Sequence, residues 1–508
     1  MEFSGILFPT GHEVPMLTTI PQCFADLNLN QVVAAVTRGK ERYGIESVYY
    51  TPLHDEETIE YRQKIMRDLE NPSLMALVKS FAGQMQTIRG QLQQMADFYY
   101  VSQEKAWFLD TAEVYCNAVQ SLADGLDGAD LHSQGFISFR AYLLSYTQST
   151  VFQSLCENAQ ATKAVLAEIR YCIYIKGTSI TVLKYEDEPD YSADVEETFA
   201  RFQQGAVKDY TVQFSDWMSM TYVDAQIVEH VRKLFPKEFE QLDTFRRNHQ
   251  AFLDETIGMF DNQIQFYVAY LDYISTLRDS NLPFCYPTVS NSKEICATET
   301  FDLALADRLV GGGESTICND FHLSGAERIF VISGPNQGGK TTFARMFGQL
   351  HFLASLGCPV PGRSARLFLF DDIYTHFERE EQVDDVNGKL KDDLLRIHEI
   401  FASATSDSIV LINEIFSSTS LEDAIYLGKQ MIETLIHLGV LAVIVTFIDE
   451  LSTLGEETVS MASTVSSGNL KSRTYKIVRK PADGIAYAIS IAEKYRLTYH
   501  QLKERLVR

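Results

Sequence analysis

The sequence lacks several features that would assign the protein to a special environment. No C-x-x-C pair occurs among its eight cysteines, so neither a zinc framework nor a disulfide framework is predicted. No uninterrupted apolar run reaches membrane-spanning length, and residues 1–19 lack the basic-then-apolar layout of a signal peptide. These absences predict a cytoplasmic protein with reduced thiols and no membrane partner.

Positive charge is also scarce in this chain. Lys and Arg number 44 against 68 Asp and Glu, which gives a net charge of −24. Because sequence-independent DNA affinity comes from clustered Lys and Arg, this composition disfavours a broad phosphate-gripping surface. A mild candidate for a local basic lining consists of Lys471, Arg473, Lys476, Arg479 and Lys480. A solvated strand edge guarded by lysine is the preferred interpretation of this group.

The first half of the sequence is predicted to be mostly helical. A length of 508 residues with 45% hydrophobic content predicts a globular protein of two or three domains. Two long segments, 80–120 and 206–277, are poor in Gly and Pro, and the second has a break near Pro236. Such long helical patterns predict either lever-like arms or a plain helical bundle. Residues 171–185 alternate in character around a Gly-containing turn and predict a β-hairpin.

The second half alternates between strand-like and helix-like runs. Strands are expected at 329–332, 409–412, 441–446 and 475–478, with helices between them, which predicts an α/β domain with a mostly parallel sheet. Residues 281–292, with two prolines, are interpreted as a linker. The fold class is therefore α + α/β, with a helical region at 1–285 and a P-loop domain at 293–508.

Residues 333–342 form the most informative motif of the chain. They read SGPNQGGKTT and fit G-x-x-x-x-G-K-[ST], between a predicted strand and a predicted helix at 343–350. A glycine-rich turn in that position presents backbone N–H groups and a helix N-terminus to phosphate. Lys340 is expected to reach the β- and γ-phosphates, and the Thr341 hydroxyl to ligate Mg²⁺. The predicted nucleotide contacts are Gly334, Pro335, Asn336, Gln337, Gly338, Gly339, Lys340, Thr341 and Thr342.

A second polar pair follows the buried strand at 409–412. Asn413 and Glu414 are expected at its carboxyl edge, where α/β sheets bind ligands. Glu414 is the candidate catalytic group, orienting the water that attacks the γ-phosphate. Thr341, Asn413 and Glu414 are the candidate Mg²⁺ ligands, although the Asn413 amide lacks the charge that favours a hard cation. The alternative is that Glu414 merely caps the next turn.

These motifs resemble those of the MutS family of DNA mismatch-repair and recombination ATPases. The resemblance rests on the P-loop at 334–342, and continues at 51–62, 357–362, 371–377, 413–424 and 483–489. It implies a helical core with lever and clamp arms followed by an ABC-like ATPase domain. It also implies ATP and Mg²⁺ as cofactors, a homodimer paired head to tail through that domain, and structured or branched DNA as a ligand.

Several positions depart from the family pattern. Asn413 stands where the family has aspartate, and Phe447 where it has histidine. Residues 387–392, at the expected trans signature, hold no hydroxyl. Thr316 occupies the position of the adenine-stacking aromatic, so Ile317 and Asn319 are expected to hold the base. Losing one oriented donor at a charged transition state can cost about a hundredfold in rate, so these changes predict slow hydrolysis.

Two functions remain open from the sequence. The leading hypothesis is a MutS-like, slowly hydrolysing ATPase that acts as a dimeric clamp on DNA in repair or recombination. Mismatch reading is not expected, since no Phe-x-Glu wedge occurs in the first section. The alternative is a nucleotide-gated protein scaffold with little ATP turnover and no direct DNA role, favoured by Asn413 and Phe447.

Overall fold

The computed structural model describes residues 3–187, 220–377, 388–466, 469–481 and 503, with the backbone alone at 465–466 and 469–473. Contacts within the chain divide it into two compact units, which are considered separately. The first contains residues 72–130 and 138–261, and the second contains 3–71, 131–137 and 262–508. The compact unit that holds the P-loop motif therefore also includes residues 3–71, which the sequence assigned to the helical region.

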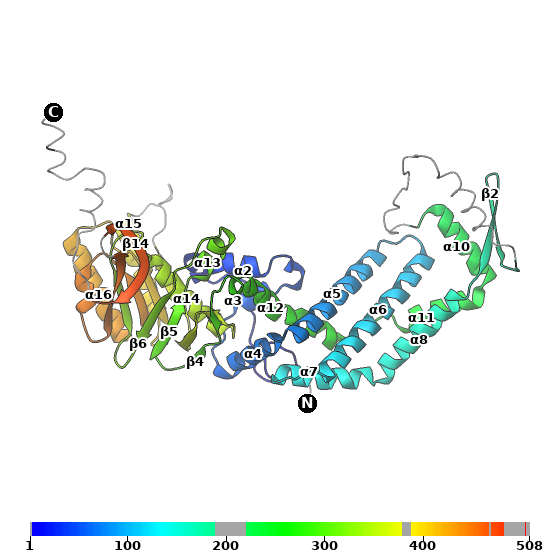
Figure 1. Ribbon diagram of the computed structural model, residues 1–508, viewed down its shortest axis with the longest axis horizontal. Coiled ribbons are helices and arrows are strands. Elements are labelled where there is room, and N and C mark those ends of the chain that lie inside the picture. The colour runs from blue at the N-terminus through cyan, green and yellow to red at the C-terminus, as the bar shows by residue number, and fades with distance from the viewer. Residues whose placement is uncertain (1–2, 188–219, 378–387, 467–468, 482–502, 504–508) are drawn as a thin grey trace. The chain divides into compact units, whose positions relative to one another are not determined.

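The first unit is built from helices. They are α5 (Pro72–Met95), α6 (Val101–Asp127), most of α7 (Gln134–Thr147), α8 (Thr150–Ala167), α10 (Tyr222–Leu234), α11 (Pro236–Asn248) and the start of α12 (Glu255–Arg278). The segment 80–120, expected to be helical, consists of parts of two helices, α5 and α6, that lie side by side (Figure 1). The chain turns because Phe98 N–H bonds the Met95 carbonyl and Tyr100 adopts an extended conformation.

Two local predictions in this unit are confirmed. Strands β1 (Tyr171–Lys176) and β2 (Ser179–Lys184) pair as an antiparallel hairpin, with Gly177 at a φ of 62° in the two-residue turn. Such turns favour glycine because they need positive φ. The predicted break at Pro236 falls between α10 and α11, where proline occupies the first turn of the new helix.

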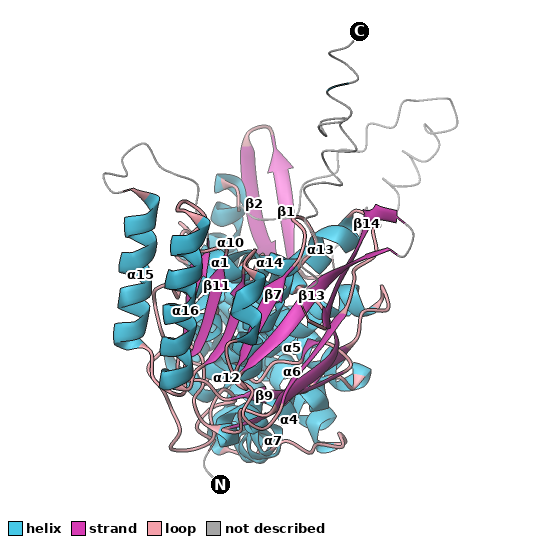
Figure 2. Cartoon of the chain, turned by 90° about the vertical axis from the view of Figure 1, so that its left-hand side faces the viewer, coloured by secondary structure: helices cyan, strands magenta, loops and turns pink. Residues whose placement is uncertain are grey.

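A six-stranded sheet forms the centre of the second unit. Its order is β10-β11-β12-β7-β13-β14, and all neighbours are parallel except β13 and β14. The predicted mostly parallel sheet is thus confirmed (Figure 2). The strands are β7 (Ile329–Ser333), β10 (Ile373–Phe377), β11 (Ile409–Asn413), β12 (Leu441–Val445), β13 (Thr458–Ser466) and β14 (Asn469–Arg479).

Continuous apolar runs in the central strands let both faces of this sheet be covered. Val331, Val410 and Ile444 share a core cluster with α15 (Lys389–Ser403) and α16 (Leu421–Leu438), which lie next to each other in Figure 2. The alternate residues face α14 (Lys340–Ser355), with the Phe330 ring centroid 6.1 Å from that of Phe343. The central strands β7, β11 and β12 are therefore buried on both faces.

A second, four-stranded sheet has the order β4-β9-β5-β6. Its strands are β4 (Thr288–Ser290), β5 (Ile295–Thr300), β6 (Asn319–Leu323) and β9 (Ser364–Phe368), and β3 (Phe284–Cys285) pairs separately with β8 (Val360–Pro361). The interpretation of residues 281–292 as a linker is wrong, since β3 and β4 lie inside that segment. Pro283 and Pro287 precede these short strands, where no ladder N–H is required of them.

The remaining elements of the second unit are short helices and α4. They are α1 (Cys23–Leu27), α2 (Leu29–Val36), η1 (Glu41–Tyr43), α3 (Glu46–Tyr50), α4 (Glu56–Leu69), α13 (Leu303–Gly311) and η2 (Asp449–Thr453). Among the residues that the structure describes, no helix has both the length and the apolar character needed to cross a membrane.

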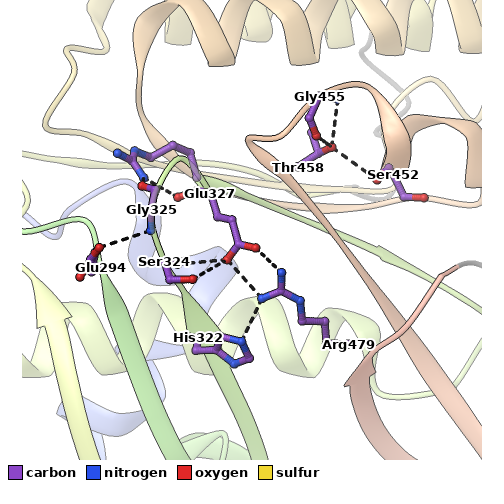
Figure 3. Close-up of polar contacts among 10 residues, drawn as sticks. Glu294, His322, Ser324, Gly325, Glu327, Ser452, Gly455, Thr458 and Arg479 are labelled. Atoms are coloured by element: carbon purple, nitrogen blue, oxygen red, sulfur yellow. Dashed lines mark hydrogen bonds and ion pairs between the residues drawn. The ribbon is translucent and has the colours of Figure 1, made fainter.

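Polar side chains join β14 to β6 and the turn that follows it. The Arg479 guanidinium pairs with the Glu327 carboxylate and donates to His322 Nε2 over 2.9 Å, as Figure 3 shows. Lys476 Nζ donates to the Cys318 carbonyl. Arg479 and Lys476, two residues of the basic group noted in the sequence, thus make contacts at a strand edge. This agrees with the interpretation of that group as a strand edge guarded by lysine.

Arg62 on α4 connects distant parts of the second unit. It is fully buried, and it donates from Nε to the Leu7 carbonyl over 3.0 Å and from Nη1 to the Leu356 carbonyl over 3.2 Å. Its guanidinium carbon also lies 5.0 Å from the centre of the Phe8 ring. Burial lowers the pKa of Arg62. One side chain therefore ties the N-terminal segment to the end of α14.

We predict that Arg62→Met lowers the free energy of unfolding by about 3 kcal/mol, because two buried carbonyls lose a charged donor. Lys64→Met is the matched control on the same helix, since Lys64 makes only an exposed ion pair with Glu60 and its loss costs about 0.5 kcal/mol or less. Calorimetric unfolding of the full chain measures both. Equal unfolding temperatures for the two variants would contradict the role given to Arg62.

Candidate nucleotide-binding site

Strand register brings the two predicted motifs to one edge of the six-stranded sheet. Asn413 of β11 pairs with Val445 of β12, which pairs with Ile332 of β7. The ladder extends one step further, because Glu414 N–H bonds the Val445 carbonyl over 2.9 Å and Thr446 N–H bonds the Ile332 carbonyl over 3.0 Å. The P-loop after β7 and the Asn413–Glu414 pair after β11 therefore lie at the same carboxyl edge, on either side of β12.

The P-loop has the strand–loop–helix setting predicted for it. Gly334 and Gly339 have φ values of 119° and 90°, which residues with a Cβ rarely adopt. Gly339 caps α14, so the first N–H groups of that helix point out of the loop. Free N–H groups and the helix dipole at this end form a site for an anion such as phosphate.

Lys340 lies at the centre of the site. Its side chain is 3% exposed, and Nζ donates to the Gly334 carbonyl over 2.9 Å and to the Pro335 carbonyl over 3.1 Å. The Glu414 Oε1 atom is 4.0 Å from Nζ, and the centre of the Phe447 ring is 4.7 Å away. The ammonium group is thus held at the mouth of the loop, between the two motifs.

The predicted Mg²⁺ ligands offer a suitable set of donor atoms. Thr341 Oγ1 donates to Asn413 Oδ1 over 2.9 Å, so these two side chains are already in contact. Glu414 adds a carboxylate next to them in sequence and at the same sheet edge. Hydroxyl, amide and carboxylate oxygens are the ligands that Mg²⁺ uses in proteins, so the residues fit this cation.

Glu414 occupies a strained turn beside a small cavity. Its φ is 56° and that of Phe416 is 60°, both unusual for residues with large side chains. The cavity has a volume of about 200 Å³ and is lined by Glu414, Phe416, Thr446, Phe447 and Leu421, among others. This space beside the carboxylate is large enough for water molecules.

Two further residues shape the P-loop and were missed by sequence reasoning. Ser463, within β13, donates from Oγ to the Gly338 carbonyl over 2.9 Å. The Tyr475 carbonyl of β14 lies 3.2 Å from the position that a Cβ on Gly339 would occupy. Neither residue belongs to a motif, and their proximity becomes evident only once β13 is known to pair with β7.

The residues predicted to hold the base differ in how they are used. Asn319 is buried, accepts a bond from Ile477 N–H over 2.8 Å, and donates to the Tyr475 carbonyl over 3.4 Å. Its polar atoms thus hold β14, while Ile317 is 40% exposed. Contacts of Ile317 and Asn319 with a base stay predictions. Residue 387 of the expected signature loop and the segment 483–489 lie outside the described residues.

Gly338→Ala is predicted to weaken nucleotide binding. A Cβ there would lie 2.2 Å from Ser463 Oγ and 2.9 Å from the Pro335 carbonyl, so the loop must shift. We expect a fluorescent ATP analogue to bind about tenfold more weakly, equivalent to one lost hydrogen bond of about 1.4 kcal/mol. Gly311→Ala is the control, because a Cβ at Gly311 meets nothing within 4 Å. Equal affinities in the two variants would argue against this account of the loop.

Comparisons with known proteins agree with this architecture. The family model of MutS domain V matches residues 330–503. The chain is 32% identical over 192 residues to Endonuclease MutS2 of Gemmatimonas aurantiaca, covering 37% of this chain and 23% of the relative. It is 29% identical over 214 residues to DNA mismatch repair protein MutS of Chlorobium phaeovibrioides, covering 41% and 24%. Endonuclease MutS2 of Thermus thermophilus is 32% identical over 187 residues, covering 36% and 25%.

The matched region spans about a quarter of the length of these curated relatives. It includes the P-loop, the Asn413–Glu414 pair and the strands that bring them together. The resemblance noted in the sequence is therefore confirmed for this part of the chain: residues 330–503 match MutS domain V.

Proposed function

We propose that this protein binds ATP with Mg²⁺ and hydrolyses it slowly. The observation that carries the proposal is the position of Lys340, held by two P-loop carbonyls and 4.0 Å from Glu414. A buried ammonium beside a cradle of N–H groups is suited to a polyphosphate. The match of residues 330–503 to MutS domain V supports the same activity, because the MutS resemblance implies an ATPase domain there.

The residues of the site would act in sequence around the γ-phosphate. Backbone N–H groups of the P-loop and α14 bind the phosphates, and Lys340 exchanges the Gly334 and Pro335 carbonyls for phosphate oxygens. Thr341 and Asn413 would hold Mg²⁺, which neutralises charge on the phosphates when it is bound. Glu414 orients a water molecule in the adjoining cavity and accepts its proton as the water attacks.

Two substitutions support slow turnover. Asn413 supplies a neutral amide at a position where a carboxylate would favour a hard cation. Phe447 provides a ring with no hydrogen-bond donor, 4.7 Å from the Lys340 ammonium. An oriented donor at a charged transition state contributes about a hundredfold in rate, so the loss of one at this position limits hydrolysis.

We further propose that the protein forms a homodimer through its ATPase domain. Large apolar side chains are exposed around the site, with Leu421 67% and Phe447 51% exposed at the cavity beside Glu414. Tyr426 on α16 and Leu394 and Leu395 on α15 are also exposed. Apolar side chains gathered around a functional site favour cover by a partner. Pairing at this face would shield the γ-phosphate from bulk water.

DNA is the proposed ligand of the dimer, in repair or recombination. This part of the proposal comes from the MutS and MutS2 relatives, whose printed names are a mismatch repair protein and an endonuclease. A clamp can hold DNA with few phosphate contacts, so the net charge of −24 is compatible with it. The second candidate is a nucleotide-gated protein scaffold, favoured by Phe447 covering Lys340 and by the neutral Asn413.

Glu414→Gln tests the enzymatic part of the proposal. We expect steady-state ATP turnover to fall by about a hundredfold or more, as for loss of a general base, with ATP affinity nearly unchanged. Lys340→Met is the companion variant and is expected to lose ATP binding itself. If wild type hydrolyses ATP no faster than Glu414→Gln while still binding it, the scaffold is the better function.

Binding to branched DNA tests the ligand. We expect fluorescence anisotropy to report ATP-dependent binding to a four-way junction that weakens as salt is raised, since phosphate contacts release counterions. A linear duplex of the same length gives the comparison, and Lys340→Met controls for the nucleotide. No binding to either DNA at low salt would exclude the DNA clamp.

A further inference from the structure

Helix α15 carries a carboxylate on its buried face. Asp393, Ile397 and Ile400 are its buried residues, and their spacing of four and three places them on one side of the helix. The two isoleucines join the core cluster under the sheet. A carboxylate in such a stripe is costly unless polar groups satisfy it, so its partners indicate why it is there.

Asp393 has partners on two other elements. Its Oδ1 atom lies 3.0 Å from Nε2 of His376, a buried residue of β10. Its Oδ2 atom accepts a bond from the Phe416 N–H over 3.4 Å, in the turn after β11. Because a carboxylate accepts, His376 carries its proton on Nε2, and its Nδ1 has no hydrogen-bond partner among the described residues. Asp393 is thus the polar contact that fixes the His376 ring.

The turn that Asp393 contacts contains Glu414. Positive φ at Glu414 and Phe416 costs about 1–3 kcal/mol for each residue, and it persists only where neighbouring contacts hold it. On one side, Glu414 N–H bonds the Val445 carbonyl over 2.9 Å. On the other side, Phe416 N–H bonds Asp393, and the Phe416 side chain is buried. Glu414 therefore lies between two backbone anchors, one on β12 and one on α15.

We propose that Asp393, oriented by His376, is a positioning residue for Glu414. It holds the turn in the conformation that directs the Glu414 carboxylate toward Lys340 and the water cavity. This inference rests on the proposed function, in which Glu414 orients the attacking water. It also gives α15 a part in catalysis, since the helix begins at Lys389, four residues before Asp393. A displacement at the start of α15 would reach the turn that contains Glu414 through the bond between Asp393 and the Phe416 N–H.

Asp393→Leu tests the inference through catalysis. Leucine suits the apolar stripe and removes both contacts, so we expect kcat for ATP to fall by about a hundredfold while KM changes by about threefold or less. Asp393→Asn keeps one oxygen for Phe416 N–H and should retain an intermediate rate. Glu399→Gln is the matched control, an exposed carboxylate on the same helix, and is expected to behave as wild type. In a Glu414→Gln background, Asp393→Leu should cause no further loss of turnover.

Hydrogen exchange of the full chain supplies a readout that does not depend on turnover. Asp393→Leu should speed exchange at the Phe416 amide by about tenfold, while amides within β11 keep their wild-type protection. If Glu414→Gln abolishes turnover but Asp393→Leu does not, the inference is overturned and the proposed function stands. A further loss in the Glu414→Gln background, or unchanged exchange at Phe416, also overturns it. If Glu414→Gln leaves turnover unchanged, the proposed function itself fails and the inference with it.

Discussion

Parallel hydrogen bonding among β7, β12 and β11 is the constraint on which the site depends. Residues 332 and 413 are 81 positions apart in the sequence, and both pair with Val445. This register leaves the P-loop and Glu414 one step beyond the last ladder bonds, at the same edge. A slip of one residue would turn every buried side chain of a strand to the other face, so the apolar cores on both faces enforce the register. Packing within the sheet thereby fixes the distance between the P-loop and Glu414.

The site mixes groups that local sequence can reveal with groups that only the topology brings close. The P-loop, Lys340 and Glu414 follow from a motif and its neighbouring strands, as does the contact of Thr341 with Asn413. Ser463 and Tyr475 could not be found in this way, because a serine in a strand and a backbone carbonyl have no pattern of their own. Asn319 shows the reverse case. The resemblance predicts that it contacts the base, whereas in the structure its polar atoms bond to the backbone of β14.

Much of the fold could also be predicted, and the errors have identifiable causes. The hairpin, the break at Pro236 and the parallel sheet follow from turn residues and apolar periodicity. The turn between α5 and α6 cannot be located from the sequence because no Gly or Pro marks it. There, the Phe98 N–H bonds the Met95 carbonyl and the Phe98 ring packs against Trp107. The short strands within 281–292 cannot be found from local sequence, because prolines precede them and β9, the partner of β4, lies far along the chain.

Helix α14 joins the phosphate cradle to Arg62, and this has a mechanical consequence. With 16 residues at about 1.5 Å each, it is a rod of about 24 Å, with Lys340 in its first turn. Just beyond its other end, the Leu356 carbonyl accepts a bond from Arg62, which also holds the Leu7 carbonyl. Helices resist compression along their axes, so an axial shift caused by an arriving phosphate would not be absorbed within α14. It would instead be passed to Arg62 and, through its bond to the Leu7 carbonyl, to the N-terminal segment.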